Sequence, residues 1–223
     1  FIHEISDGRF RFGIGVSHGT MLESRGLTSG KPLADTRKFV DDLRNAPRVG
    51  ELPPIILATL RKKMIALAEE IGQGMVFANG ARSHMQESLS VLSDETRVND
   101  DFFIGDMIPT CISNDVEAAK AVNRKTLTSY AFLPNYRNYW KEAGYVEEME
   151  GLEQCLADGD VDRVSHFLTD KWLADTTLFG TASQVREGVE AWFDAGVKVP
   201  ILVPSSANGG QMVAFEELFA IFE

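Results

Sequence analysis

The fold is decided by residues 8–19, which read Gly8-Arg9-Phe10-Arg11-Phe12-Gly13-Ile14-Gly15-Val16-Ser17-His18-Gly19. The segment Arg9 to Gly15 alternates in character and predicts a β-strand. Gly13 and Gly15 carry no Cβ, so a planar ring or a phosphate can approach the backbone closely at the end of this strand. The plainer interpretation is that these glycines only let a helix pack against the strand.

Strands alternate with helices in the residues that follow. Apolar side chains at helical spacing predict a helix from Pro32 to Arg44. The next predicted elements are a strand at Ile55 to Ala58, a helix at Arg61 to Ile71, a strand at Gly74 to Ala78, a helix near Ser83 to Leu92 and a strand within Phe102 to Ile112. Strands that are separated by helices predict a parallel sheet.

The C-terminal part begins with a long helical excursion and ends on a strand. Asn114 and Glu117 have the spacing of a capping box, and helical segments then continue to about Asp175. A second capping box at Thr181 and Gln184 starts a helix that continues as Val185 to Asp194, stops at Gly196 and precedes a strand at Val197 to Val203. We therefore expect five strands in a single domain that spans residues 1–223.

Composition and charge narrow the possible partners. Lys and Arg number 22 and Asp and Glu 33, so the formal net charge of −11 argues against nucleic acid and against an anionic membrane surface. The apolar runs are far shorter than the roughly 18 to 20 residues that a membrane-spanning helix needs. Cys111 and Cys155 lack CxxC spacing, so we expect buried free thiols and a reducing, cytoplasmic setting.

Several segments in chain order resemble the bacterial luciferase-like monooxygenase superfamily, in particular its branch that depends on coenzyme F420. Residues 8–19 resemble the fourth-strand motif of that branch, and the pattern continues after Gly180 with a family-like ending up to Pro204. The other matching segments are Arg25-Gly26 through Pro32-Leu33, Pro54 to Met64, and Gly74 to Phe77. Each piece is weak by itself, but five pieces in order are specific.

The resemblance implies a (β/α)8 TIM barrel whose cofactor lies at the C-terminal ends of the strands. Five strands cannot close such a barrel, and Phe1 to Ile5 lacks an initiator methionine, so we expect the first three βα units to be absent from this chain. An open doubly wound sheet is the alternative that requires no missing unit. The resemblance further implies a homodimer.

In the family, two adjacent loops hold the phosphate of the cofactor, and the resemblance implies the same role for two predicted loops of this chain. One comprises Ala58, Thr59, Leu60, Arg61 and Lys62, and the other comprises Asn79, Gly80, Ala81 and Arg82. Each loop follows a strand and opens a helix, where backbone N–H groups and the positive end of the helix dipole attract anions. The plainer interpretation is a helix cap with solvated basic side chains.

The residues that follow the first strand are candidates for contact with the cofactor ring. Gly13, Gly15, Val16 and Ser17 are predicted to bind the cofactor, and His18 is the candidate catalytic residue. Because imidazole titrates near neutral pH, His18 is suited to transfer the proton that accompanies hydride transfer. It is equally suited to hold the cofactor or a loop carbonyl through a hydrogen bond.

The functional hypothesis is an oxidoreductase that transfers a hydride between coenzyme F420 and a small organic substrate. An FMN-dependent monooxygenase of the same fold is the first alternative, and a cofactor-free interaction fragment is the second. The histidines show no metal-ligand spacing, so no metal site is predicted.

Overall fold

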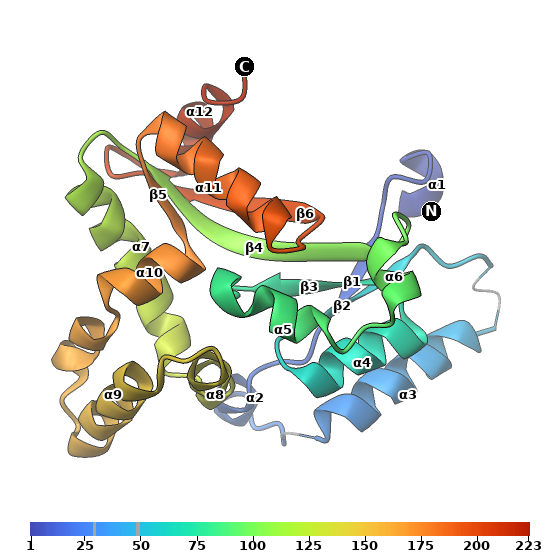
Figure 1. The fold of residues 1–223 in the computed structure, drawn as a ribbon. Coiled ribbons are helices and arrows are strands. Elements are labelled where there is room, and N and C mark those ends of the chain that lie inside the picture. Colours follow the sequence, from blue (N-terminus) through green and yellow to red (C-terminus); the bar gives the residue numbers. More distant parts are fainter. Residues whose placement is uncertain (29, 48–49) are drawn as a thin grey trace. The chain divides into compact units, whose positions relative to one another are not determined.

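The computed structural model of the chain describes residues 1–28, 30–47 and 50–223 (Figure 1). The described residues form two compact units. Unit 1 comprises Phe1–Phe77 and Glu87–Ile104, and unit 2 comprises Ala78–Gln86 and Gly105–Glu223. Strand β3 (Gly74–Ala78), helix α5 (Met85–Leu89) and strand β4 (Phe103–Ile112) each contribute residues to both units.

Unit 1 is built on short parallel strands with buried apolar side chains. Strand β1 (Phe12–Ile14) pairs with β2 (Ile55–Ala58), with Gly13 beside Ile56 and Ile14 beside Leu57. Strand β2 pairs in turn with β3, with Ala58 beside Val76. The buried residues Ile55, Leu57, Met75 and Phe77 form the core of these strands. Parallel pairing requires a crossover between strands, and helices supply it here.

Two helices of unit 1 pack against each other (Figure 1). Helix α3 (Pro32–Arg44) has proline in its first turn and buries Thr36 and Val40, and α4 (Lys62–Ile71) buries Ile65, Leu67, Ala68 and Ile71. Helix α4 also contacts β2. The remaining helices of unit 1 are α1 (Ile2–Ile5), α2 (Gly19–Ser24) and α6 (Asp94–Val98), which begins at the capping side chain of Ser93.

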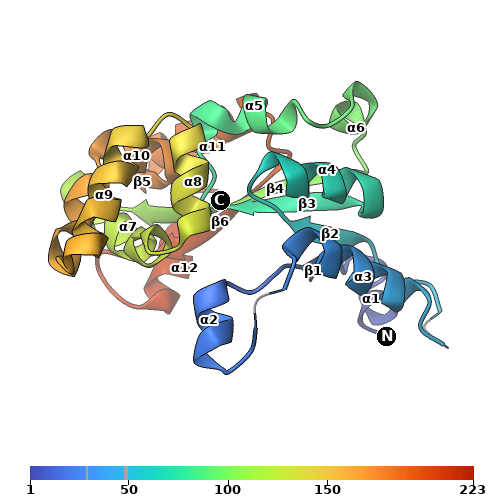
Figure 2. The same ribbon diagram turned by 90° about the horizontal axis from the view of Figure 1, so that it is seen from below.

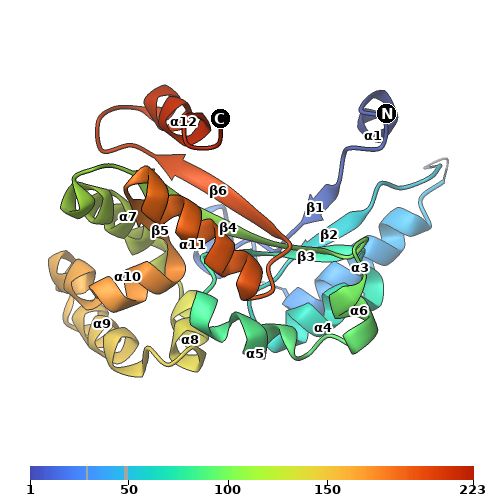
Figure 3. The same cartoon turned by 45° about the horizontal axis from the view of Figure 1, so that its top comes forward.

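Unit 2 has a long strand, β4, between two parallel neighbours. Strand β5 (Leu178–Gly180) pairs with the C-terminal end of β4, and β6 (Val199–Ser205) pairs with β4 from Gly105 to Cys111. Helix α11 (Ala182–Asp194) connects β5 to β6 and contacts both, and α12 (Gln211–Phe219) also contacts β6 (Figure 3).

A helical excursion connects β4 to β5 in unit 2 (Figure 2). It comprises α7 (Val116–Ala131), α8 (Pro134–Glu142), α9 (Val146–Asp158), the 3-10 segment η2 (Val161–Phe167) and α10 (Asp170–Thr176). Its interior is aromatic: the Trp140 ring lies edge-on to Trp172 at 4.8 Å and tilted against Tyr136 at 5.5 Å. Such aromatic pairs stabilise a packed core.

Most predicted elements of this α/β fold with parallel strands are confirmed. The helix Pro32–Arg44, the strands Ile55–Ala58 and Gly74–Ala78, and the capping box of Thr181 and Gln184 are observed as predicted. Cys111 and Cys155 are buried free thiols. Ser29, within the segment from Arg25 to Leu33, lies outside the described residues.

Other predicted elements need correction. The strand expected at Arg9–Gly15 is limited to Phe12–Ile14, the helix near Ser83–Leu92 is the shorter α5 preceded by the 3-10 turn η1 (Arg82–His84), and the last strand is Val199–Ser205. The capping box at Asn114 and Glu117 is wrong, because Asp115 caps α7 by accepting from the N–H of Ala118. The prediction of five strands is wrong, because it omits β5. This strand is only three residues long, too short to show a periodic pattern in the sequence.

Candidate functional site

In unit 1, the C-terminal ends of β1 and β2 form a surface with few side chains. Because Ile14 pairs with Leu57, Gly15 follows beside Ala58, and a Cβ on Gly15 would lie 2.9 Å from the Ala58 Cβ. A Cβ on Gly13 would have no neighbour within 4 Å. Gly13, Gly15 and Ala58 are all exposed. Gly13 therefore leaves room for a flat group to approach the backbone, whereas Gly15 has no such room because the Ala58 Cβ lies against the position that its own Cβ would take.

The residues after β1 lead into helix α2. Val16 and Ser17 are exposed, and His18 is the N-cap of α2, where its carbonyl oxygen accepts from the N–H of Leu22 at 3.1 Å. The His18 side chain is half-buried. The predicted ring-contacting residues thus lie together at one strand end, and the backbone of His18 is fixed by the first turn of a helix.

Thr59 joins β2 to the N-terminus of α4. Its N–H donates to the carbonyl oxygen of Val76 at 2.8 Å, and its side chain is 6% exposed. Among the described residues, the Thr59 hydroxyl has no hydrogen-bond partner. Helix α4 begins after Arg61 without a side-chain cap. A buried hydroxyl beside an uncapped helix N-terminus is an arrangement that an anion satisfies.

The basic side chains of this segment are at the surface. Arg61 is exposed, and Lys62 forms an ion pair with Glu87 while half of its side chain remains accessible. Leu60 is half-buried. The charge that Lys62 offers to an anion is therefore shared with a carboxylate, which reduces its contribution.

In unit 2, the loop after β3 is anchored through its backbone. Asn79 adopts a left-handed conformation with φ 57°, its N–H donates to Met107, and its carbonyl oxygen accepts from the Trp140 indole N–H at 3.2 Å. The N–H of Gly80 donates to the Asp106 carboxyl at 3.3 Å. The N–H of Ala81 donates to the hydroxyl of Tyr139 at 3.0 Å.

These bonds limit what the backbone of Asn79–Arg82 can offer to an anion, and the role of this loop in cofactor binding stays a prediction. The N–H groups of Asn79, Gly80 and Ala81 already have acceptors within unit 2. Local sequence patterns did not indicate these acceptors, because they come from β4 and α8, far along the chain. What this loop retains for an anion is the half-buried side chain of Arg82.

A second carboxylate, Asp175, holds the next residue of the loop. It accepts from the N–H and the hydroxyl of Ser83 and from the hydroxyl of Tyr145. Burial and this bond to Asp175 raise the pKa of Tyr145. A cavity of about 390 Å³ adjoins the cluster, lined by Arg82, Ser83, Ala143, Gly144, Tyr145, Lys171, Ala174 and Asp175. Asp106 and Asp175 are residues that sequence patterns did not single out.

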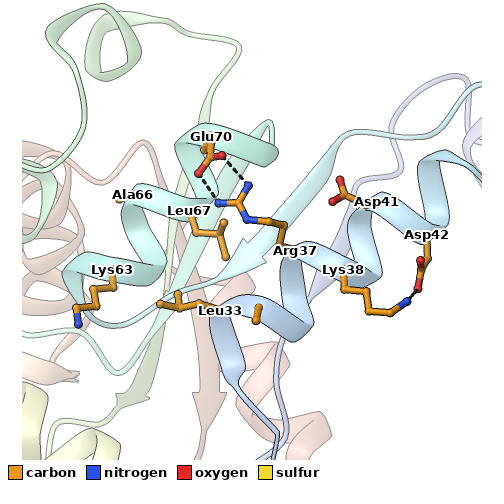
Figure 4. Close-up of a pocket in the computed structure, with 10 residues that line it drawn as sticks. Leu33, Arg37, Lys38, Asp41, Asp42, Lys63, Ala66, Leu67 and Glu70 are labelled. Atoms are coloured by element: carbon orange, nitrogen blue, oxygen red, sulfur yellow. Dashed lines mark hydrogen bonds and ion pairs between the residues drawn. The ribbon is translucent and has the colours of Figure 1, made fainter.

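In unit 1, a groove of about 640 Å³ lies between α3 and α4 (Figure 4). Arg37 from α3 forms two hydrogen bonds with Glu70 from α4, and Lys38 pairs with Asp42 on its own helix. None of the predicted site residues lines this groove. Its two ion pairs, Arg37 with Glu70 and Lys38 with Asp42, lie at the surface, so we interpret it as a helix packing groove.

The described residues contain neither a candidate membrane-spanning helix nor a candidate metal site. No helix in the ranges 1–28, 30–47 and 50–223 is long and apolar enough to cross a membrane. In the same ranges, no group of three or more His, Cys, Asp or Glu side chains is arranged to hold a metal ion.

Comparison with known proteins adds a family and a set of relatives. The family model described as Luciferase-like monooxygenase matches residues 1–198. A curated relative, 5,10-methylenetetrahydromethanopterin reductase of Archaeoglobus fulgidus, is 24% identical over 229 aligned positions, which cover 88% of this chain and 68% of the relative.

Two solved structures share the fold at low sequence identity. One is the coenzyme F420-dependent tetrahydromethanopterin reductase from Methanopyrus kandleri, with a TM-score of 0.69, 14% identity, and coverage of 97% of this chain and 76% of that one. The other is an F420-dependent secondary alcohol dehydrogenase in complex with an F420-acetone adduct, with a TM-score of 0.68, 14% identity, and coverage of 100% and 72%.

Proposed function

We propose that this chain, which belongs to the luciferase-like monooxygenase family and is an oxidoreductase, transfers a hydride between coenzyme F420 and a small organic substrate. The resemblance of residues 8–19 to this family is confirmed by the match over residues 1–198. The F420 dependence named for two relatives of the same fold supports the choice of cofactor. We also propose the (β/α)8 barrel, the homodimer and the cytoplasmic location on the strength of the family alone.

The observation that carries the cofactor proposal is the unsatisfied hydroxyl of Thr59. It lies buried beside the uncapped start of α4, and an anionic group of the cofactor would supply the acceptor that it lacks. Ala58, Leu60, Arg61 and Lys62 complete this segment. Gly13, where a Cβ would meet no protein atom within 4 Å, leaves space for a ring system at the end of β1.

The roles of the chain's residues follow from these positions. Gly13, Gly15, Val16 and Ser17 would lie against the ring of the cofactor, and Thr59 to Lys62 would hold its phosphate. A bound deazaflavin supplies two-electron, hydride-type chemistry. His18 would hold or transfer a proton at an imidazole nitrogen close to that strand end. In unit 2, Asn79, Gly80 and Ala81 would position Arg82, whose guanidinium is the group suited to a phosphate.

A titration of the purified protein with coenzyme F420, and separately with FMN, tests the proposal. We expect F420 to bind and FMN to bind at least about tenfold more weakly, a difference of about 1.4 kcal/mol. An FMN-dependent monooxygenase is the second candidate because the matching family is described by monooxygenase activity. Tight FMN binding with substrate-dependent oxygen uptake would establish that candidate, and binding of neither would favour a cofactor-free role.

A further inference from the structure

Asp106 is a buried acid that neither the sequence patterns nor the proposed chemistry uses. Its side chain is 0% exposed, and it lies on β4 beneath the loop that begins at Asn79. One carboxyl oxygen accepts from the N–H of Gly80 at 3.3 Å. Among the described residues, the other oxygen, Oδ2, has no hydrogen-bond partner.

The loop lies tightly over this carboxyl. A Cβ on Gly80 would be 3.0 Å from Asp106 Oδ2 and 3.1 Å from the terminal methyl of Met85, closer than ordinary contacts. The side-chain amide nitrogen of Asn79, Nδ2, also lacks a partner among the described residues, although the side chain is only 4% exposed. A side chain at position 80 would therefore press on the carboxyl of Asp106, so the loop fits closely over the acid only with glycine there.

The backbone N–H groups that donate to Asp106 favour a negative charge on it, but burial outweighs them. Its hydrogen-bonding partners are the backbone N–H groups of Gly80 and Met107, and no cation in the described part of the chain contributes to its titration. From α8, Tyr136 faces it, and burial, with the charges of Tyr130 and Asp106, raises the pKa of Tyr136. Next to the loop, the ring of His84 lies edge-on to Tyr139 at 5.8 Å.

We propose that Asp106 is a positioning residue that holds the Asn79–Ala81 loop, and through it Arg82, only while its carboxyl group is uncharged. An isolated carboxylate in a dry interior is far costlier than a neutral carboxyl with one unpaired oxygen. Burial accordingly raises the pKa of Asp106 to about 8. When the group ionises, it must be hydrated, and hydration requires the loop above it to move away.

Trp140 reports the position of the loop directly, because its indole N–H donates to the carbonyl oxygen of Asn79. Tryptophan fluorescence is therefore followed from about pH 6.5 to about pH 9.5, a range that brackets the ionisation. We expect a transition near pH 8 in the wild-type protein, its absence in Asp106→Asn, and loss of its amplitude in Trp140→Phe. The exposed Asp101→Asn variant serves as the matched control and keeps the wild-type transition.

Absence of the transition in the wild-type protein, or the same transition in Asp106→Asn, would overturn the proposal. If Asp106→Asn does not fold, Gly80→Ala decides instead. Its added methyl group presses on Oδ2, so its fluorescence at pH 7 should match that of the wild-type protein above pH 9. A Gly80→Ala spectrum identical to wild type at pH 7 would count against the proposal.

The role of Arg82 rests on the proposed function, and the affinity of the protein for coenzyme F420 tests whether the loop affects binding. We expect wild-type affinity to weaken about tenfold for each unit of pH above 8, while the affinity of Asp106→Asn stays constant. If the fluorescence transition occurs and the affinity does not follow it, Asp106 positions the loop but the loop does not bind the cofactor. If F420 does not bind at all, the proposed function fails and the fluorescence result still decides the inference.

Discussion

The carboxylate of Asp175 accepts two hydrogen bonds from Ser83, one from the backbone N–H at 2.8 Å and one from the hydroxyl at 2.7 Å. The two residues lie 92 positions apart in the sequence. Tyr145 donates a third bond to the same carboxylate at 2.8 Å. The helical excursion of unit 2 therefore fixes the loop that carries Arg82.

Replacing Asp175 by alanine should destabilise the protein by about 2 to 4 kcal/mol, because it leaves the N–H of Ser83 and the hydroxyl of Tyr145 without an acceptor. Chemical denaturation followed by circular dichroism measures this change. The exposed Asp162→Ala variant is the control and should lie within about 0.5 kcal/mol of wild type. Equal effects of the two substitutions would show that the hydrogen bonds to Asp175 contribute nothing to the free energy of unfolding.

Gly13→Ala tests whether a ligand covers the end of β1. A Cβ at Gly13 meets no protein atom within 4 Å, so the free energy of unfolding should hardly change. If the cofactor ring lies against this backbone, F420 affinity should fall about tenfold or more. Gly210→Ala, where a Cβ also meets nothing within 4 Å, is the matched control. Unchanged affinity in Gly13→Ala would remove Gly13 from the site.

Thr59→Val tests the anion site at the start of α4. The substitution keeps the shape and removes a buried hydroxyl without a partner, so stability should stay level or rise. F420 affinity should fall about tenfold, which corresponds to the loss of one hydrogen bond to a charged group. Thr59→Ser restores the hydroxyl and should recover most of the affinity. A stable Thr59→Val protein with wild-type affinity would refute this site.

The free energy of unfolding should fall with rising pH because of the buried carboxyl group of Asp106. Its pKa lies near 8 in the folded protein against an ordinary value of 3.8, so between these values the folded state holds a proton that the unfolded chain has released. The free energy of unfolding therefore falls as the pH rises through this window and levels off above it. In Asp106→Asn this fall should disappear, and urea denaturation at several pH values measures both curves. The slope will be read above about pH 5, because ordinary carboxylates titrate below that value.

Gly74 is predicted to be the glycine of unit 1 that tolerates substitution worst. A Cβ there would lie 2.4 Å from the Cβ of Phe103 and 2.6 Å from its carbonyl oxygen, both parts of a rigid strand. Gly74→Ala should cost about 3 kcal/mol or more. Gly144→Ala is the comparison, since φ there is 98° but no atom lies within 4 Å, and it should cost only about 1 kcal/mol. Thermal denaturation of both variants separates steric overlap from backbone conformation.

Local sequence patterns were sufficient where the controlling interactions are local. The helix Pro32–Arg44 follows from proline in its first turn and from apolar spacing, and the capping box of Thr181 and Gln184 joins groups three residues apart. Residues 8–19 likewise indicated the family, because glycines at a strand end depend only on the local chain. The cap of α7 was misplaced by one residue, since Asn114 and Asp115 are both good caps and only the fold selects one.

The sequence by itself determined most of the helices and strands, the family, and the segments that we propose to carry the site. Tertiary structure decided which of their polar groups remain available to a ligand. The N–H groups of Gly80 and Ala81 are taken by Asp106 and Tyr139, whereas the hydroxyl of Thr59 is buried without a partner. The physical reason is that each buried polar group must find its partner in space, and these partners come from segments that no local pattern connects.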